Sequence, residues 1–253
     1  MDNIPTQAFI FSGGFGLRMR PITLTTHKSL IKVGGKPLLD YAIDKMAACG
    51  VTDIHVNTHY RADDILHHLK HRQEHDPVPR FHISYEPELL ETGGTVALAL
   101  PELQNQPFFT LNPDTLCLDG ATPALHRLAN AFDPDTMLGM LLVHPVEKAI
   151  GYPGNGDFGL QNNQLYFPKE KNETLPYVYT GIGIFHPRLW QQIELPTPPY
   201  SINHFFKALR DDDDIIQHIY GLVHDGQWLH IGTPEELDVA QSFMAHETAY
   251  VSK

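Results

Sequence analysis

Three glycines follow a short apolar run near the start of the sequence, at Gly13, Gly14 and Gly16. Glycines let successive backbone N–H groups converge on an anion, because no side chain stands in the way. The turn lacks the Walker pattern GxxxxGK followed by Ser or Thr, and Met19 stands where a dinucleotide fingerprint needs its third glycine. The turn is therefore a candidate phosphate-binding loop; the alternative is an ordinary tight turn beside solvated basic residues.

Positive charge is concentrated beside this turn, although the chain as a whole has a formal net charge of −12. No acidic residue lies between Asp2 and Asp40, and the basic residues in that stretch are Arg18, Arg20, Lys28, Lys32 and Lys36. A positive local field favours a polyphosphate as the bound anion. The acidic balance elsewhere argues against a general nucleic-acid or anionic-membrane binder, since those surfaces attract lysine and arginine.

The elements that would position the turn alternate between strands and helices. Apolar runs bounded by turn residues predict strands at 8–12, 53–59, 81–86, 108–112, 137–144, 180–186 and 215–221. Helical spacing is found at 39–50, 62–71, 121–132 and 233–247, the last with Thr233 as its N-cap. This alternation predicts an α/β, Rossmann-like fold with a mostly parallel sheet and helices on both faces. Short strands at 156–160 and 164–167 predict a small antiparallel insertion.

No linker is long enough to cut the chain into independent units, so we expect one domain over residues 1–253. Cys49 and Cys117 each lie in an apolar run, which favours buried, reduced thiols. The first residues have no basic region followed by a long apolar stretch, and no window approaches the length of a membrane span. We therefore expect a cytoplasmic protein that is a monomer or a small homo-oligomer.

The stretch SGGFGLRMRPITLTTHKSLIKVGGKPLLDYAI resembles the opening of the sugar-1-phosphate nucleotidyltransferases, whose signature is a strand, GGxGxRhxPhT and then PKxhhxhxGxPhh. The resemblance continues in the family's order through ETGGTVALALP, FFTLNPD, GDFGL, YTGIGIFHP and QWLHIGTPEELDVAQ. Within this family the chain looks most like the N-acetylmuramate-1-phosphate uridylyltransferases of cell-wall recycling. Short mannose-1-phosphate guanylyltransferase-like proteins share much of the pattern.

This resemblance implies the nucleotide-diphospho-sugar transferase fold and a reaction between a nucleoside triphosphate and a sugar 1-phosphate. An oxygen of the sugar 1-phosphate would attack the α-phosphorus and expel pyrophosphate, without a covalent enzyme intermediate. It also implies a nucleotide-binding half, 1–135, and a sugar-phosphate-binding half with a closing helix, 136–253. Such a transfer depends mainly on positioning and charge stabilisation.

The same resemblance assigns roles to residues of the nucleotide side. Ser12, Gly13, Gly14 and Gly16 would hold the triphosphate, Arg18 would stabilise the leaving pyrophosphate, and Lys28 would bridge the two reacting phosphates. Gly93 and Gly94 would lie against the nucleobase, where a missing Cβ lets the ring approach the backbone. The alternative for this ETGG segment is a helix start capped by Thr92.

Asp114 follows the strand at 108–112, at the end where parallel sheets bind ligands, and is a candidate Mg²⁺ ligand. Its alternative is an aspartate in a Pro-Asp-Thr turn. By resemblance, His230 stands where relatives have the second metal-binding acid, and imidazole suits Mn²⁺ or Zn²⁺ better than Mg²⁺. Two interpretations stay open: a metal site with altered preference, helped by Asp225, or a catalytically weakened binding protein.

On the sugar-phosphate side, the resemblance points to Asn112, Glu170, Lys171, Thr180 and Gly181. The glycine would let a sugar hydroxyl come close to the strand. For Glu170 and Lys171 the alternative is a solvated charge pair in the polar run PKEKNE. The expected ligands are thus a nucleoside triphosphate, a sugar 1-phosphate and Mg²⁺, with Mn²⁺ or another divalent metal as the alternative cofactor.

Overall fold

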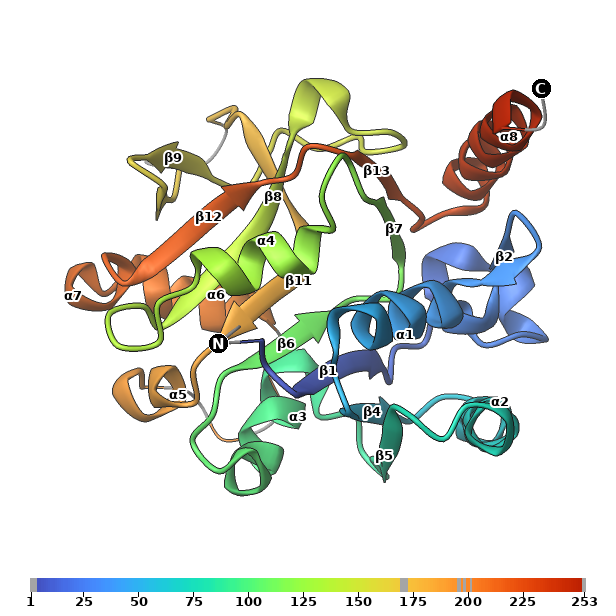
Figure 1. The fold of residues 1–253 in the computed structure, drawn as a ribbon, viewed down its shortest axis with the longest axis horizontal. Helices are drawn as coiled ribbons and strands as arrows, with labels where there is room; N and C mark the ends of the chain where they lie inside the picture. Colours follow the sequence, from blue (N-terminus) through green and yellow to red (C-terminus); the bar gives the residue numbers. More distant parts are fainter. Residues whose placement is uncertain (1–3, 169–172, 195–196, 198, 201, 252–253) are drawn as a thin grey trace.

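The computed structural model describes residues 4–168, 173–194, 197, 199–200 and 202–251. Its central element is a nine-stranded sheet with the strand order β5-β4-β1-β6-β11-β8-β12-β10-β9 (Figure 1). In that order the strands are Arg80–Tyr85, Asp53–Thr58, Gln7–Ser12, Phe108–Leu111, Tyr177–Phe185, Gly139–Pro145, Ile219–Val223, Gln164–Tyr166 and Gly159–Gln161.

Most strands of this sheet point in the same direction, which confirms the predicted α/β class. β5, β4, β1 and β6 are parallel to one another, and β12 is parallel to β8. β11 runs antiparallel between β6 and β8. β9 and β10 form the expected antiparallel insertion at one edge. The reversal at β11 brings Gly181 beside Asn112, whose N–H donates to the Gly181 carbonyl at 2.9 Å.

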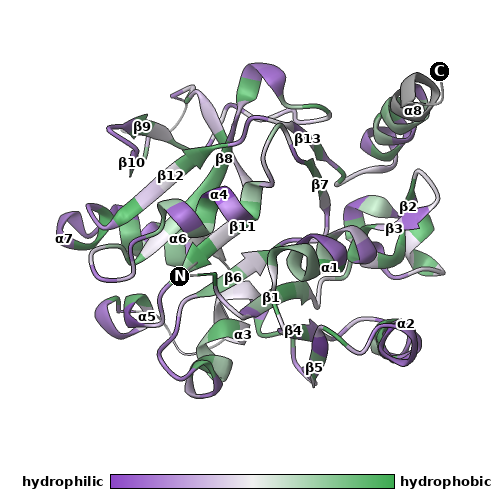
Figure 2. Ribbon diagram, viewed as in Figure 1, coloured by the Kyte–Doolittle hydropathy of each residue, from purple (hydrophilic) through white to green (hydrophobic). Residues whose placement is uncertain are grey.

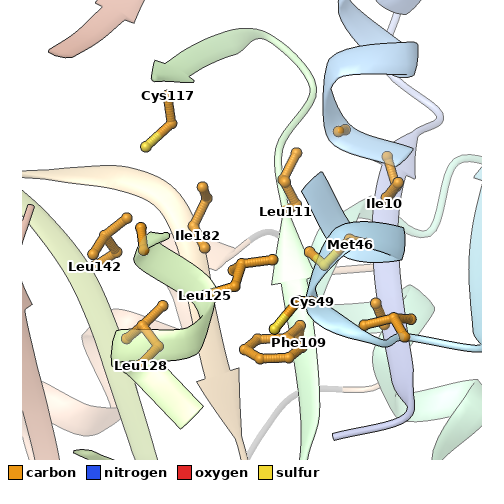
Figure 3. Close-up of a cluster of buried hydrophobic side chains, with 14 of the residues drawn as sticks. Ile10, Met46, Cys49, Phe109, Leu111, Cys117, Leu125, Leu128, Leu142 and Ile182 are labelled. Carbon is orange, nitrogen blue, oxygen red and sulfur yellow. The ribbon is translucent and has the colours of Figure 1, made fainter. Parts of the chain in front are cut away.

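Helices cover both faces of the sheet. One core contains side chains of α1 (Leu38–Cys49), α2 (Ala62–His75) and α4 (Ala124–Ala131) packed on the strands; Figure 3 shows part of it. The other face carries α3 (Glu91–Ala99), α5 (Arg188–Gln192) and α6 (Ile202–Arg210). Figure 2 shows hydrophobic residues along the strands and hydrophilic ones on α2 and α7 (Asp213–Ile216).

In the described part of the chain, two two-stranded sheets are separate from the nine-stranded one. β7 (Thr115–Leu118) pairs antiparallel with β13 (Gln227–His230), and a short hairpin joins β2 (Lys32–Val33) to β3 (Lys36–Pro37). α8 (Pro234–Val251) closes the chain beside β2 (Figure 1). The 3-10 turns are η1 (Leu17–Met19), η2 (Ile22–Leu24), η3 (Lys28–Leu30), η4 (Leu100–Leu103) and η5 (Val146–Lys148). The β7–β13 pair sets His230 opposite Thr115, next to Asp114.

Several predicted elements have other bounds in the structure, and two of them change in a way that the residues explain. The run 215–221 was predicted as one strand, but it begins in α7 and enters β12 only at Ile219. The reason is Asp212, whose Oδ1 accepts hydrogen bonds from the N–H groups of Asp214 and Ile215 and so caps a helix. The helix expected at 121–132 begins at Ala124, after the extended Pro123.

The two cysteines are buried free thiols, as expected. Burial raises the pKa of Cys49 to about 11 and that of Cys117 to about 12, so neither is a reactive thiolate near neutral pH. Among the described residues, no helix combines the length and the apolar character that crossing a membrane requires.

Candidate active site

A cavity of about 330 Å³ opens at the carboxyl ends of β1 and β6. Ligand sites of open α/β sheets lie at this edge. The lining residues belong to segments that are far apart in the sequence: Phe11, Ser12, Gly13, Gly14, Gly16, Leu17, Arg18, His27, Lys28, Ser29, Asn57, Leu89, Glu91, Thr92, Asn112, Pro113, Asp114 and Gly232. The fold thus gathers the glycine turn, both proposed catalytic cations and Asp114 around one space.

Two of the turn glycines are required by the protein's own packing. A Cβ on Gly13 would lie 2.8 Å from Asn57 Nδ2 and 2.9 Å from Leu89 Cδ1. Gly16 has a φ of 62°, in the left-handed region, and a Cβ there would lie 2.9 Å from Thr23 Cγ2. A Cβ on Gly14, in contrast, would meet nothing within 4 Å. Gly14 lines the cavity, and the protein's own packing does not require a glycine there.

A buried polar network holds the start of the turn. Asn57, at the end of β4, accepts a hydrogen bond from the Ser12 N–H at 2.9 Å and donates to Glu86 Oε1 at 3.0 Å. Thr95 donates to the same oxygen at 2.6 Å, and the Leu90 N–H donates to Glu86 Oε2 at 3.0 Å. Of these residues only Ser12 was predicted; Asn57 lies among other polar residues of β4, DIHVNT, so no local pattern distinguished it.

Lys28 and Asp114 form an ion pair at the floor of the cavity. Lys28 Nζ lies 2.9 Å from Asp114 Oδ2, and the two side chains are 16% and 31% exposed. Burial would raise the pKa of the Asp114 carboxyl, but the positive charge and hydrogen bond of Lys28, together with the positive charge of Arg18, outweigh it and lower the pKa. Asp114 is therefore a carboxylate at neutral pH, and its partner already occupies one of its oxygens.

Arg18, by contrast, is exposed on η1 and has no salt bridge to any residue that the structure describes. Its Nη2 lies 3.1 Å from where a Cβ on Gly232 would be, which places it beside the end of β13. A guanidinium without a carboxylate partner at the mouth of a cavity is available to an anionic ligand.

His27, which stands where the family pattern has proline, is buried next to Lys28. Its Nδ1 accepts a hydrogen bond from the Ser29 N–H at 3.1 Å and caps η3. Burial lowers the pKa of His27 to about 4, so the ring is neutral near pH 7. The residue thus adds no charge to the cavity that it lines.

Gly93 and Gly94 lie inside α3, where both are buried. A Cβ on Gly93 would lie 2.5 Å from Tyr200 Cε2, and the Gly94 N–H donates to the Tyr200 carbonyl at 3.2 Å. Neighbouring Glu91 and Thr92 line the cavity at this point. Contact of the two glycines with a nucleobase stays a prediction. The segment is a helix start, as the alternative expected, but Thr92 is not its cap, because α3 begins at Glu91 and its N-cap position makes no side-chain hydrogen bond.

On the sugar-phosphate side, Asn112 lines the cavity. Thr180 is fully buried and its hydroxyl donates to the Leu142 carbonyl at 2.8 Å, so the side chain is engaged in the sheet. Gly181 has a φ of 86°, and a Cβ there would lie 2.9 Å from Asn112 Cβ. Glu170 and Lys171 lie outside the described residues.

His230 ends β13 and has a carboxylate beside it, but that carboxylate is not Asp225. Asp225 forms an ion pair with Arg127 at 2.6 Å, beyond the opposite end of the β7–β13 ladder. The nearest acidic group to His230 is Glu236, whose Oε2 lies 2.9 Å from His230 Nδ1. The proposed help from Asp225 is therefore wrong, because the ladder carries the two residues apart.

The donor set fits a metal that is bound partly by substrate. Among the described residues, no three His, Cys, Asp or Glu side chains converge on a point that could hold an ion. A carboxylate such as Asp114 at the cavity wall suits Mg²⁺, which typically takes one or two protein carboxylates and completes its shell with phosphate oxygens and water. His230 offers a softer, nitrogen ligand beside it.

The architecture is the nucleotide-diphospho-sugar transferase fold. A solved structure described as a putative glucose-1-phosphate thymidylyltransferase from Bacillus anthracis, in complex with a sucrose, superposes with a TM-score of 0.75. The match covers 94% of each chain at 22% sequence identity, a level that speaks to fold alone.

The chain belongs to the nucleotidyl transferase family, whose model matches residues 7–247. An N-acetylmuramate alpha-1-phosphate uridylyltransferase of Caulobacter vibrioides is 33% identical over 246 residues, covering 97% of this chain and 99% of that protein. A mannose-1-phosphate guanyltransferase of Schizosaccharomyces pombe is 30% identical over 91% of this chain, but the chain spans only 62% of its length. The chain is thus a nucleotidyltransferase.

Proposed function

We propose that this chain transfers a uridylyl group from UTP to N-acetylmuramate 1-phosphate and releases pyrophosphate. The observation that carries nucleotidyl transfer is the convergence of the glycine turn, Arg18, Lys28 and Asp114 on one cavity. The choice of substrates is supported by the relative from Caulobacter vibrioides, which aligns over nearly the full length of both chains. The product would be a sugar nucleotide of cell-wall recycling, made in the cytoplasm.

In this reaction the protein supplies positioning and charge. The backbone of residues 13–16 binds the triphosphate, and Arg18 stabilises the charge that develops on the leaving pyrophosphate. An oxygen of the sugar 1-phosphate attacks the α-phosphorus, and Lys28 holds the two reacting phosphates together. Both substrates are anionic and repel each other, and each of these groups offsets part of that negative charge. The transfer therefore needs no protein nucleophile.

We further propose a divalent metal, Mg²⁺ or Mn²⁺, at Asp114. When bound, the metal neutralises phosphate charge and polarises the α-phosphoryl group. Lys28 contacts only Oδ2 of Asp114 in this structure, so a metal would be held by Oδ1 or by exchange with Lys28 at Oδ2. In either case the Lys28 ammonium stays beside the phosphates that it is proposed to bridge.

Two observations support alternative functions. The match to the guanyltransferase of Schizosaccharomyces pombe favours GTP and mannose 1-phosphate as a second substrate pair. The imidazole of His230 favours a nucleotide- and sugar-phosphate-binding protein of weakened activity, because a neutral ring brings no negative charge to a metal.

Pyrophosphate release against a substrate panel separates these functions. UTP and GTP would each be combined with N-acetylmuramate 1-phosphate, N-acetylglucosamine 1-phosphate and mannose 1-phosphate, in Mg²⁺ and in Mn²⁺. The proposal expects the highest kcat/KM for UTP with N-acetylmuramate 1-phosphate. Preference for GTP with mannose 1-phosphate would favour the guanylyl alternative, and absence of turnover across the panel would favour the binding protein.

A further inference from the structure

Glu236 is held rigidly behind His230. Its Oε2 accepts the N–H groups of Gly232 at 2.6 Å and Thr233 at 3.1 Å, while the Glu236 N–H donates to Thr233 Oγ1 at 3.3 Å. This reciprocal arrangement is a capping box, formed by the Thr-x-x-Glu sequence at the start of α8. The carboxylate therefore has a fixed place and direction, and its side chain is only 12% exposed.

The same oxygen lies 2.9 Å from His230 Nδ1. Nδ1 is buried and has no other partner among the described residues; its direction towards Glu236 falls short of a well-aligned hydrogen bond. The ring centroids of Tyr152 and Trp228 each lie 6.1 Å from that of His230 and 5.8 Å from each other, so the three rings pack as a triangle. Because Nδ1 is buried, solvent does not compete with the carboxylate for a proton on it.

We propose that Glu236 is a positioning residue that holds the Nδ1 proton of His230 and so leaves Nε2 as the nitrogen that can bind a metal ion. Carboxylates commonly fix metal-binding histidines in this way. The inference rests on the proposed function, in which a divalent metal is bound beside Asp114. It adds that His230 and Glu236 act together as the second ligand group.

The charge of this pair matches that of the acid which the resemblance places at position 230. A neutral imidazole with an ionised glutamate carries a net charge of −1, the charge of a single carboxylate. Because the Glu236 oxygen is engaged by two backbone N–H groups, the glutamate acts through the ring rather than as a direct ligand. This fits the lack of a three-residue metal cluster among the described residues.

The tautomer of His230 can be measured without substrate or turnover. In ¹⁵N-histidine-labelled full-length enzyme, long-range ¹H–¹⁵N spectra distinguish Nδ1–H from Nε2–H, and the His230 signal among the 16 histidines is the one lost in His230→Asp. We expect Nδ1–H in the wild type and an increase of the Nε2–H form in Glu236→Ala. A dominant Nε2–H form in the wild type would overturn the inference.

Metal binding supplies the second readout, with Mn²⁺ alone as the probe. Paramagnetic broadening of the His230 ring signals should require about 10- to 100-fold more Mn²⁺ in Glu236→Gln than in the wild type. Asp238→Asn removes one exposed carboxylate from the same helix and should change little. Absence of His230 broadening in the wild type, or equal Mn²⁺ affinity in Glu236→Gln, would contradict the inference.

A double-mutant comparison separates this role from helix capping. In the His230→Asp background, Glu236→Gln should no longer weaken Mn²⁺ binding, measured by electron paramagnetic resonance, since aspartate carries its own charge. An equal loss in both backgrounds would show that Glu236 acts only through the cap of α8. Because none of these measurements uses turnover, their failure is distinguishable from failure of the substrate panel.

Discussion

Lys28 Nζ lies 2.9 Å from Asp114 Oδ2, so the cation proposed to bind phosphate is paired with the carboxylate proposed to bind metal. The two residues are 86 positions apart in the sequence and meet because η3 packs over the carboxyl end of β6. On the proposed function, a metal bound at Asp114 would exchange with Lys28 at Oδ2 or share the carboxylate with it. In the free enzyme the ion pair favours the ionised form of Asp114.

Lys28→Met tests this exchange. We expect kcat to fall about 100- to 1000-fold, as when one preorganised cation or donor is removed from a transition state. Mn²⁺ should bind the substrate-free variant more tightly than the wild type, because nothing then competes for Asp114. Lys32→Met, an exposed neighbour, serves as the control in kinetics and Mn²⁺ titration. Unchanged kcat, or weaker Mn²⁺ binding, would refute the exchange.

Arg18→Ala should affect rate and spare the fold. The guanidinium is exposed and has no salt bridge to a described residue, so its loss should change the thermal midpoint by no more than about 2 °C. We expect a fall in kcat of about 100-fold or more. Arg20→Ala, also exposed, is the matched control in steady-state kinetics and calorimetry. Near-normal turnover of Arg18→Ala would remove Arg18 from the mechanism.

Substitution of the turn glycines should have different effects, on ligand binding at Gly14 and on stability at Gly13. Gly14→Ala places its Cβ in open space, so we expect stability to change little while UTP binding weakens, as measured by calorimetry. Gly13→Ala forces its Cβ against Asn57 and Leu89 and should cost about 1–3 kcal/mol of unfolding free energy in urea titrations. If Gly14→Ala bound UTP as the wild type does, the triphosphate would not lie against that face of the turn.

His27 should make the protein less stable in weak acid. Its folded pKa is lowered from 6.5 to about 4, so between these pH values the unfolded chain binds a proton that the folded chain does not. Lowering the pH from 6.5 to 4 therefore reduces the unfolding free energy, by at most about 3 kcal/mol from this residue. Above pH 6.5 the ring is neutral in both states and the contribution is constant.

The variant His27→Asn isolates this term, because its side-chain oxygen can still accept the Ser29 N–H bond. Urea unfolding from pH 6.5 down to 4 should show a shallower loss of stability in His27→Asn than in the wild type. The exposed His75→Asn provides the reference curve. Parallel curves for the wild type and His27→Asn would mean that His27 is protonated in the folded state.

Local patterns were sufficient for most of the sheet and for one wall of the site. The period of Leu39, Ile43 and Met46 and the stop at Gly50 predict α1 correctly, since a helix with one buried face leaves that spacing. The glycine turn and the run of basic residues beside it predict an anion site from residues that are close together in sequence. Lys28 and Asp114 were both identified, but not their ion pair.

What escaped sequence reasoning depends on long-range packing. The Ser12–Asn57–Glu86 network joins the ends of three elements, and no local pattern marks a buried carboxylate that is satisfied by neutral donors. The β7–β13 pair is equally nonlocal, and it decides that His230 faces Glu236 rather than Asp225. Packing can also count against an assignment: the resemblance placed Thr180 on the sugar-phosphate side, but its hydroxyl donates to the Leu142 carbonyl within the sheet.

The central claim is nucleotidyl transfer at Asp114, and pyrophosphate release by the wild type and Asp114→Asn tests it most directly. With UTP, N-acetylmuramate 1-phosphate and either Mg²⁺ or Mn²⁺, we predict steady turnover by the wild type. We predict a loss of about 100-fold or more in Asp114→Asn, with the fold intact by circular dichroism. Equal rates for the two proteins, or no pyrophosphate from the wild type with any substrate pair, would contradict the account.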